Sequence, residues 1–432
     1  MIPQSQFLVL AQVAAGRESE LRGLLATMNS APGVADPANA LVPFGQFPQL
    51  HFARLVVLDD PSLGGIQPYG SPRPSLPVYL ALLGSCDGAA EEFLAALAQR
   101  AARGLRRIFS HCQGFDANAD LLSWMRQRRV PLAASYVNWV GRSVRQIREE
   151  AAIARAVASK VDRSPIAPLA EAQQRRRQLI AFIDAEISAG RLGLTTPDPT
   201  PVRWQLARIV NLVGIPLIGL LLLPLFLILL PFALFTLRRK EESDPEICPR
   251  PDPAALLELQ TAEDRDVSNQ YTALGSVKPG LFRRGLEVLL LIAIDYACRH
   301  VFNRGYLARV QTIHFAFWAL IDGKRRLVFA SNYDGGHEPY MDDFINKVAW
   351  GLNLAFSSGV GWPRTRWLVA RGARIEGTFK YYQRRHQLPT DTWYKAYPGL
   401  TLTDLNRNQR IREGLQREPM SDVEALAWLQ LL

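Results

Sequence analysis

The chain has few cysteines, and none of them is spaced for metal binding. It contains four in 432 residues, with no CxxC or comparable pair. It also lacks HExxH, CxxCH, a glycine-rich phosphate loop and a GxSxG elbow. A dedicated zinc site, a c-type haem, a phosphate-loop nucleotide site and a serine-hydrolase site are therefore unsupported. We interpret the four thiols as reduced, in a protein that faces the cytosol.

The first residues lack the marks of a signal peptide. Residues 1–13, MIPQSQFLVLAQV, have no basic region and no long apolar run. Apolar residues are nevertheless abundant at 48 %, which suffices for sizeable cores in the two or three domains that the length predicts. The net charge of +10 suits anionic lipid. Because aromatics are not interleaved with a basic patch, no nucleic-acid partner is expected.

Two segments of the chain resemble each other, about 50–150 and 313–414. The first begins LHFARLVVLDD and the second IHFAFWALIDG. An Asp-Gly pair follows in each, and a glycine stands 27 residues after each of these aspartates (114 − 87 and 361 − 334). A Pro-x4-Tyr-x4-Gly pattern comes later in both. Four landmarks in the same order indicate an internal duplication.

Each half predicts the element order β-α-β-β-α-β, which is the ferredoxin-like order. The first half places these elements at 6–13, 17–28, 51–59, 77–85, 91–109 and 134–140. The second half places them at 269–277, 281–302, 313–323, 325–333, 338–356 and 392–397. The predicted class is α+β, with two ferredoxin-like repeats packed sheet to sheet as an α+β barrel and an inserted membrane helical hairpin.

This order and duplication resemble the dimeric α+β barrel superfamily, over roughly residues 5–150 and 268–415. GSCDG at 84–88 is similar to the GxxDG string of dye-decolourising peroxidases within it. The resemblance implies a haem cofactor, an aspartate on the distal side of the haem and a proximal histidine from the second half. The Asp-Gly is equally explained as turn and cap chemistry between a strand and a helix.

Residues 209–237 form an apolar run of 29 residues, long enough for a membrane segment. Basic residues flank both ends, so the positive-inside rule keeps both ends on the cytoplasmic side. Three prolines interrupt the run, and each arm of a hairpin would be about 21 Å long, short of a ~30 Å hydrocarbon core. We predict a re-entrant, monotopic hairpin in the inner (cytoplasmic) membrane, with the globular part facing the cytoplasm. A single tilted span remains the alternative.

The predicted domain organisation follows from the duplication and the apolar run. A second apolar stretch, 286–294, is too short to span a membrane and is assigned to the core in preference to the interface. The predicted divisions are 1–160 (first repeat), 161–205 (helical and proline-rich linker), 206–240 (membrane segment), 241–267 (linker) and 268–432 (second repeat).

The candidate functional residues lie mostly in the second half. His51 and His314 are equivalent between the halves, and each could ligate a haem, act as an acid or base, or hydrogen-bond a neighbouring strand. They are the cofactor-binding candidates. The first half is expected to be mainly structural. The catalytic candidates follow a strand of the second half or come later in it: Asn332, Asp334, His337 and Arg364.

Two functions compete, and the sequence does not settle whether the protein is an enzyme. One is a membrane-attached, peroxidase-like oxidoreductase, with haem, that acts on an apolar or lipid-derived substrate. It predicts a large pocket between the sheets that contains a histidine. The other is a non-catalytic membrane module that binds lipid or holds a partner. It predicts a pocket without convergent titratable groups, or no pocket. Membrane lipid and an apolar small molecule are the expected partners, and an oligomer is possible.

Overall fold

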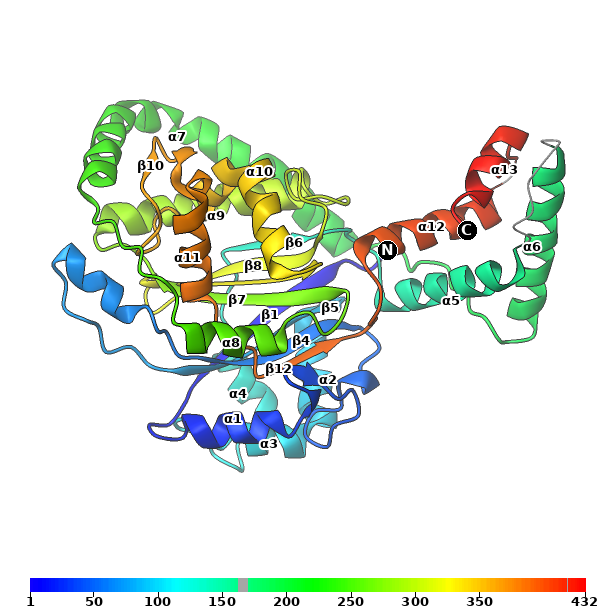
Figure 1. Cartoon of the computed structure of the whole chain (residues 1–432), viewed down its shortest axis with the longest axis horizontal. Coiled ribbons are helices and arrows are strands. Elements are labelled where there is room, and N and C mark those ends of the chain that lie inside the picture. The colour runs from blue at the N-terminus through cyan, green and yellow to red at the C-terminus, as the bar shows by residue number, and fades with distance from the viewer. Residues whose placement is uncertain (162–169, 418) are drawn as a thin grey trace.

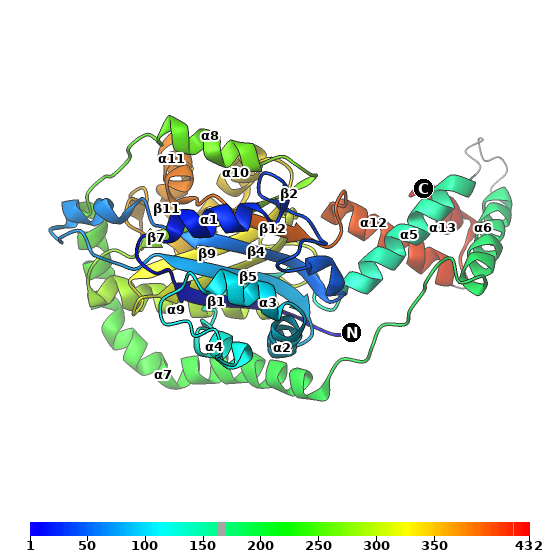
Figure 2. The same ribbon diagram turned by 90° about the horizontal axis from the view of Figure 1, so that it is seen from below.

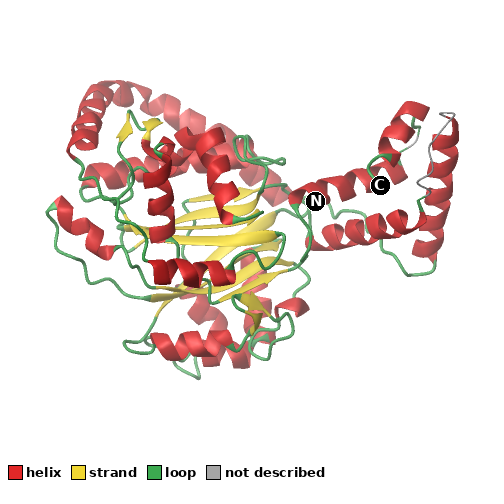
Figure 3. Cartoon of the chain, viewed as in Figure 1, coloured by secondary structure: helices red, strands yellow, loops and turns green. Residues whose placement is uncertain are grey.

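The computed structural model describes residues 1–161, 170–417 and 419–432, and its centre is a pair of β-sheets (Figures 1 and 3). The first sheet has the order β1-β5-β4-β12-β3-β2, and the second has the order β6-β8-β9-β7. Strands of the first sheet are β1 (Gln4–Gln12), β2 (Asn29–Ala31), β3 (Val34–Ala35), β4 (Leu50–Leu58), β5 (Tyr79–Asp87) and β12 (Thr392–Lys395). Strands of the second are β6 (Ala134–Val137), β7 (Ser268–Ser276), β8 (Ile313–Ile321) and β9 (Arg326–Asp334).

The two sheets pack face to face, and helices cover their outer faces. Along β4, Leu55 and Val57 pack with the helices, whereas Val56 and Leu58 join apolar residues of the second sheet. Both faces of the strand are buried, which explains why it is apolar without alternation. The fold is therefore α+β, as predicted. The sheets are stacked and not closed into a barrel, because in the described chain no strand of one forms a backbone ladder with a strand of the other.

Each sheet contains one strand from the other half of the chain. β6 pairs antiparallel with β8, and β12 pairs antiparallel with β4. The last strand of each predicted repeat thus lies in the sheet built mainly by the other half. Neither half could complete its sheet alone.

The outer helices differ in length between the two halves. The first sheet is covered by α1 (Glu18–Ala26), α2 (Ala90–Arg100), α3 (Ala102–Phe109) and α4 (Leu121–Gln127). The second is covered by α9 (Leu281–His300), α10 (His337–Phe356) and α11 (Glu376–His386). The single helix predicted over 91–109 is two helices, because the backbone leaves the helical region at Ala101 (φ −109°, ψ 22°). Short elements complete the chain: α8 (Pro253–Ala262), β10 (Thr365–Arg366), β11 (Ala370–Arg371) and the 3-10 turns Phe44–Gln46, Leu63–Tyr69 and Gly372–Arg374.

A helical arm projects from the sheets (Figures 1 and 2). It consists of α5 (Val144–Lys160), α6 (Ala170–Ser188), α12 (Leu402–Gln416) and α13 (Asp422–Leu429). The arm has an apolar core of its own, which includes Ile153, Val157, Ile183 and Trp428. The stretch 161–205, predicted as a linker, therefore contributes α6 to a folded unit.

The long apolar run lies in α7 (Val202–Ser243), a single helix of 42 residues. The predicted two-armed hairpin is therefore wrong in form. A tight turn would leave unpaired peptide groups in hydrocarbon, whereas a continuous helix that bends at prolines keeps most of its hydrogen bonds. Pro216, Pro224 and Pro231 lie inside the helix, which curves around the outside of α9 (Figures 1 and 2). α7 is long and apolar enough to cross a membrane, and its apolar window is wholly exposed.

Both ends of α7 are attached to α9. Near its start, the Asn211 side chain lies 2.8 Å from His300 Nε2, at the end of α9. At its end, Asp244 pairs with Arg283 in the first turn of α9 and with Lys278 at 3.0 Å. The chain therefore leaves and rejoins the same folded body.

Candidate functional site

Each half contains a buried histidine–aspartate pair. His51 Nε2 lies 2.9 Å from an oxygen of Asp87, and His314 Nε2 lies 2.7 Å from an oxygen of Asp334. Both histidines are almost fully buried. Each histidine stands on its strand where the pairing register shifts, between Leu50 and Phe52 in β4 and at the same place in β8. A bulge re-aims a side chain, so the register shift in each strand places the two imidazoles alike.

The second carboxylate oxygen of each pair holds the start of an arm helix. Asp87 accepts the backbone N–H of Val144 (2.9 Å), the first residue of α5. Asp334 accepts that of Leu402 (2.7 Å), the first residue of α12. A carboxylate at a helix N-terminus accepts a hydrogen bond from an otherwise unpaired N–H, and its negative charge is stabilised by the positive end of the helix dipole. The pairs therefore join the sheets to the arm.

A small hollow lies between the two pairs. Its lining includes His51, His314, Tyr397, Asn138 and Arg142. The Tyr397 hydroxyl lies 3.2 Å from His51 Nδ1. The hollow has a volume of about 20 Å³, which is room for about one water molecule. A haem does not fit beside these histidines as they stand, and one ring nitrogen of each already contacts an aspartate.

The other predicted site residues do not join this hollow. Asn332 lies between the sheets, where its side-chain oxygen accepts from Trp393 Nε1 (3.1 Å) and from Arg54. Arg364 donates to the backbone oxygen of Asp244 (2.9 Å) at the end of α7. His337 is buried at the start of α10. Of the six candidates, the structure brings together His51, His314 and Asp334.

His337 has an unusual environment. Neither of its ring nitrogens has a hydrogen-bonding partner within the described residues. Burial, assisted by the positive charges of Arg384 and Lys380, lowers the pKa of His337 to about 3. The imidazole is therefore neutral at physiological pH.

A much larger cavity lies between α9, α10 and the second sheet. Its volume is about 280 Å³ and its walls are apolar, with Ile294, Trp318, Phe329 and Leu352 among them. Cys298 is its one titratable side chain among the described residues, and burial raises the pKa of that thiol to about 12. The walls can therefore hold an apolar chain but offer no acid, base or nucleophile at neutral pH.

The cavity opens on an apolar part of the surface. Two of its lining residues, Ala293 on α9 and Trp350 on α10, are exposed, Trp350 by 45 %. Leu289 and Ile292, on α9 near Ala293, are also exposed. α7 passes along the outside of the same helix (Figure 2). The mouth thus lies partly on α9, the helix to which both ends of α7 are attached.

The cavity was not predicted, although the apolar stretch at 286–294 was a feature of the sequence that bears on it. The stretch 286–294 was assigned to the core, but only Glu287 and Leu291 in it are buried and its other face is exposed. A run that is apolar on all faces of a helix predicts burial without distinguishing protein from lipid or ligand. The core assignment is therefore only half right.

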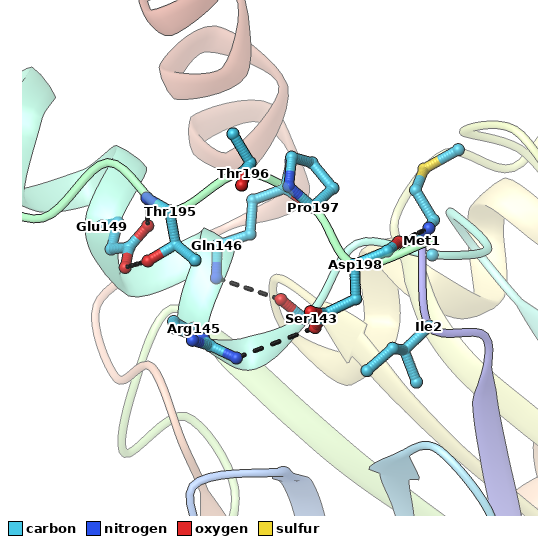
Figure 4. A pocket seen from close by; sticks show the side chains of 11 residues that line it. Met1, Ile2, Ser143, Arg145, Gln146, Glu149, Thr195, Thr196, Pro197 and Asp198 are labelled. Carbon is cyan, nitrogen blue, oxygen red and sulfur yellow. Dashed lines mark hydrogen bonds and ion pairs between the residues drawn. The ribbon is translucent and has the colours of Figure 1, made fainter. Parts of the chain in front are cut away.

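A third hollow lies where the segment before α7 crosses the start of α5 (Figure 4). There Glu149 accepts from the backbone N–H (2.8 Å) and the hydroxyl (2.6 Å) of Thr195, and Arg145 lies 3.8 Å from Asp198. The polar groups pair with one another across the hollow. These contacts attach the segment before α7 to the arm, and the hollow has little room for a ligand.

No family model, no curated protein and no solved structure matches the chain. The interpretation of the two cavities therefore rests on their own chemistry: a small one of about 20 Å³ beside the two histidine–aspartate pairs, and an apolar one more than ten times larger.

Proposed function

We propose that the protein is a membrane-attached binder of an apolar, lipid-derived molecule, whose chain enters the cavity between α9 and α10 from the bilayer. The observation that carries the proposal is the cavity of about 280 Å³, with apolar walls that are formed in part by α9, the helix to which α7 is attached. Of the two competing hypotheses, the binding module is the one that expects a pocket without convergent titratable groups. The volume is close to the lower end of ligand pockets, roughly 300–1,000 Å³.

The energetics favour exchange over tight capture. A chain of about ten methylene groups gains ~8 kcal/mol on leaving water, at ~0.8 kcal/mol per group. A lipid that comes from the bilayer has already made that gain, since lipid tails are as apolar as leucine. Occupancy is then decided by dispersion contacts and by shape. The protein would select a chain by its length or branching.

The geometry of α7 supports attachment to one leaflet. Asn211 and Asp244, which attach α7 to α9, are 33 residues apart, or about 50 Å of helix at ~1.5 Å per residue. Their partners on α9, His300 and Arg283, are 17 residues apart, or about 26 Å of helix. The excess length must bow outward. The basic residues that flank the run and the exposed Trp350 and Trp367 suit the headgroup region. We propose that the arch enters the cytoplasmic leaflet of the inner membrane and returns.

The duplication also belongs to this proposal. The two histidine–aspartate pairs lie at corresponding bulges of β4 and β8. In each, Nε2 of the histidine contacts the aspartate, and the aspartate also accepts the first N–H of an arm helix. The reciprocal exchange of β6 and β12 is what two ferredoxin-like repeats related by a twofold axis would make. The oxidoreductase and haem remain predictions. The large cavity has no histidine among its described lining residues, which weighs against them.

A binding experiment with matched variants tests the proposal. The full chain, purified in detergent and exchanged into nanodiscs, is titrated with a fluorescent polyene fatty acid that accepts energy from tryptophan. Ala297→Phe fills the cavity and is expected to weaken binding at least tenfold. Leu281→Phe, at the exposed start of the same helix and outside the cavity lining, is the control and should bind like the wild type. Equal binding by both variants would contradict the proposal.

A further inference from the structure

Beyond lipid binding, we propose that the small hollow beside Arg142 is a site for a small monovalent anion, of halide or formate size. Arg142 follows β6 and lies just before α5, where its residue is 3 % exposed. His314 and Asn138 line the same hollow. Its volume of about 20 Å³ admits one small ligand.

Arg142 has donors to spare and no acidic partner. Its Nη2 donates to the side-chain oxygens of Asn406 (2.9 Å) and Gln409, two neutral amides on α12. Its Nε and Nη1 are buried and have no hydrogen-bond partner within the described residues, and the guanidinium lies over the Trp139 ring, 4.5 Å from the ring centroid. A buried guanidinium without a carboxylate, and with two unused donors, is destabilising unless something negative completes it. An anion that accepts from Nε and Nη1 would do so.

The nearby carboxylates are already engaged. Asp87 and Asp334 each use one oxygen for a histidine and the other for a helix N–H. Glu150 accepts from Gln146 (2.8 Å) and lies 3.4 Å from Arg412. Burial raises the pKa of Glu150, which weakens it as a counter-charge. None of the three forms an ion pair with Arg142 among the described contacts.

The two helix starts at the hollow are already capped. Leu402 and Leu405, in the first turn of α12, line the hollow, and Ile147 does so from α5. The carboxylates of Asp334 and Asp87 hold these two helix starts, so the positive ends of the helix dipoles are offset there. Within the described residues Asn138 Oδ1 has no hydrogen-bond partner and is an acceptor, so it would face a water or a protonated atom rather than the anion. The charge that favours an anion over a cation is therefore that of Arg142.

Thermal unfolding at constant ionic strength tests the site in the full chain in detergent. Sodium gluconate, whose anion is too large, is replaced stepwise by sodium formate or bromide. The wild-type midpoint should rise on the order of 2 °C per tenfold increase of the small anion once its site begins to fill. Arg142→Met should abolish the rise. Arg145→Met, at an exposed arginine in the first turn of α5, should keep it.

A second variant keeps the test decisive if Arg142→Met does not fold. Asn406→Asp places a carboxylate on the existing hydrogen bond to Nη2 and supplies the missing negative charge. It should melt higher than the wild type in gluconate and respond less to formate. A wild type that is indifferent to the small anions, or an Asn406→Asp protein that melts no higher in gluconate and responds in full, would overturn the proposal. Neither result bears on chain binding in the apolar cavity.

Discussion

Replacement of Asp244 by asparagine should detach the end of the membrane helix from the folded body. Asp244 follows α7 directly and is buried. Its carboxylate contacts two buried cations, Lys278 at 3.0 Å and Arg283, whose residue is 1 % exposed. Asparagine keeps the size and one acceptor but removes the negative charge. The two cations would then face each other without their common partner.

The expected loss is several kcal/mol. Removal of one member of a buried ion pair costs about 3–5 kcal/mol, because the partner charge stays buried. Lys278 can escape part of this, since burial and Arg283 already lower its pKa to about 8 and it would lose its proton without Asp244. Arg283 cannot deprotonate, so most of the loss falls on it. We therefore expect Asp244→Asn to lower the free energy of unfolding by about 3 kcal/mol.

The assay is denaturation in detergent at pH 7, followed by tryptophan fluorescence. Glu246→Gln is the control, because Glu246 pairs with Arg364 at 3.3 Å but is exposed, and such a pair contributes about 0–1 kcal/mol. Arg283→Met in the Asp244→Asn background should recover part of the loss by removal of the stranded charge. A loss below about 1 kcal/mol for Asp244→Asn would refute the reasoning, since the pair would then behave like a surface one.

Three further predictions concern buried titratable groups. The pKa of His337 is about 3 in the folded protein, and its ordinary value is 6.5. Between these pH values the unfolded state binds a proton that the folded state does not, so the stability of the fold should fall as the pH falls from 6.5 toward 3. His337→Leu should flatten that fall in melting temperature. Burial raises the pKa of Glu287 from 4.5 to about 8, so between these pH values the folded state binds a proton that the unfolded state does not. The stability of the fold should therefore fall as the pH rises from about 4.5 to 8. The melting temperature of Glu287→Gln should not show this dependence on pH. His314→Ala should speed hydrogen exchange at the Leu402 amide about tenfold, since one charge-assisted contact of ~1.5–3 kcal/mol is weakened, while His51→Ala should leave that amide unchanged.

Strand and helix positions were largely predictable from the sequence. The strand predicted at 325–333 is β9 (Arg326–Asp334), and the helix predicted at 338–356 is α10 (His337–Phe356). Runs that are buried on both faces carry a strong local signal, and Asp-Gly ends each strand with a left-handed glycine (Gly88 φ 76°, Gly335 φ 81°). The exchange of β6 and β12 was not predictable, because partner choice depends on contacts between residues hundreds of positions apart.

The candidate site was predictable only in part. His51 and His314 were singled out as equivalent, Asp334 as a catalytic candidate and Asp87 as the aspartate of the GxxDG string. That Asp87 and Asp334 each pair with a histidine, 36 and 20 residues away, was not predicted. His337 was chosen because it follows an Asp-Gly, and the structure buries it apart from the pairs. The apolar cavity has no sequence signature, since the same leucines and phenylalanines would fill a solid core. Whether apolar side chains meet or leave space depends on helix placement by a few ångströms.

The two halves differ in how the layer between sheet and helices is filled, and this difference supports a ligand-binding role for the cavity. Over the first sheet the equivalent layer is closed by aromatic rings, with Phe47 against Phe93 (5.7 Å between centroids) and Phe109 against Trp124 (4.5 Å). Left empty, the apolar walls of the cavity would lack the packing contacts that a filled layer makes, which destabilises the fold. The cavity lies over the second sheet, between α9 and α10, and both ends of α7 are attached to α9, so a chain drawn from the membrane would offset the cost where it arises.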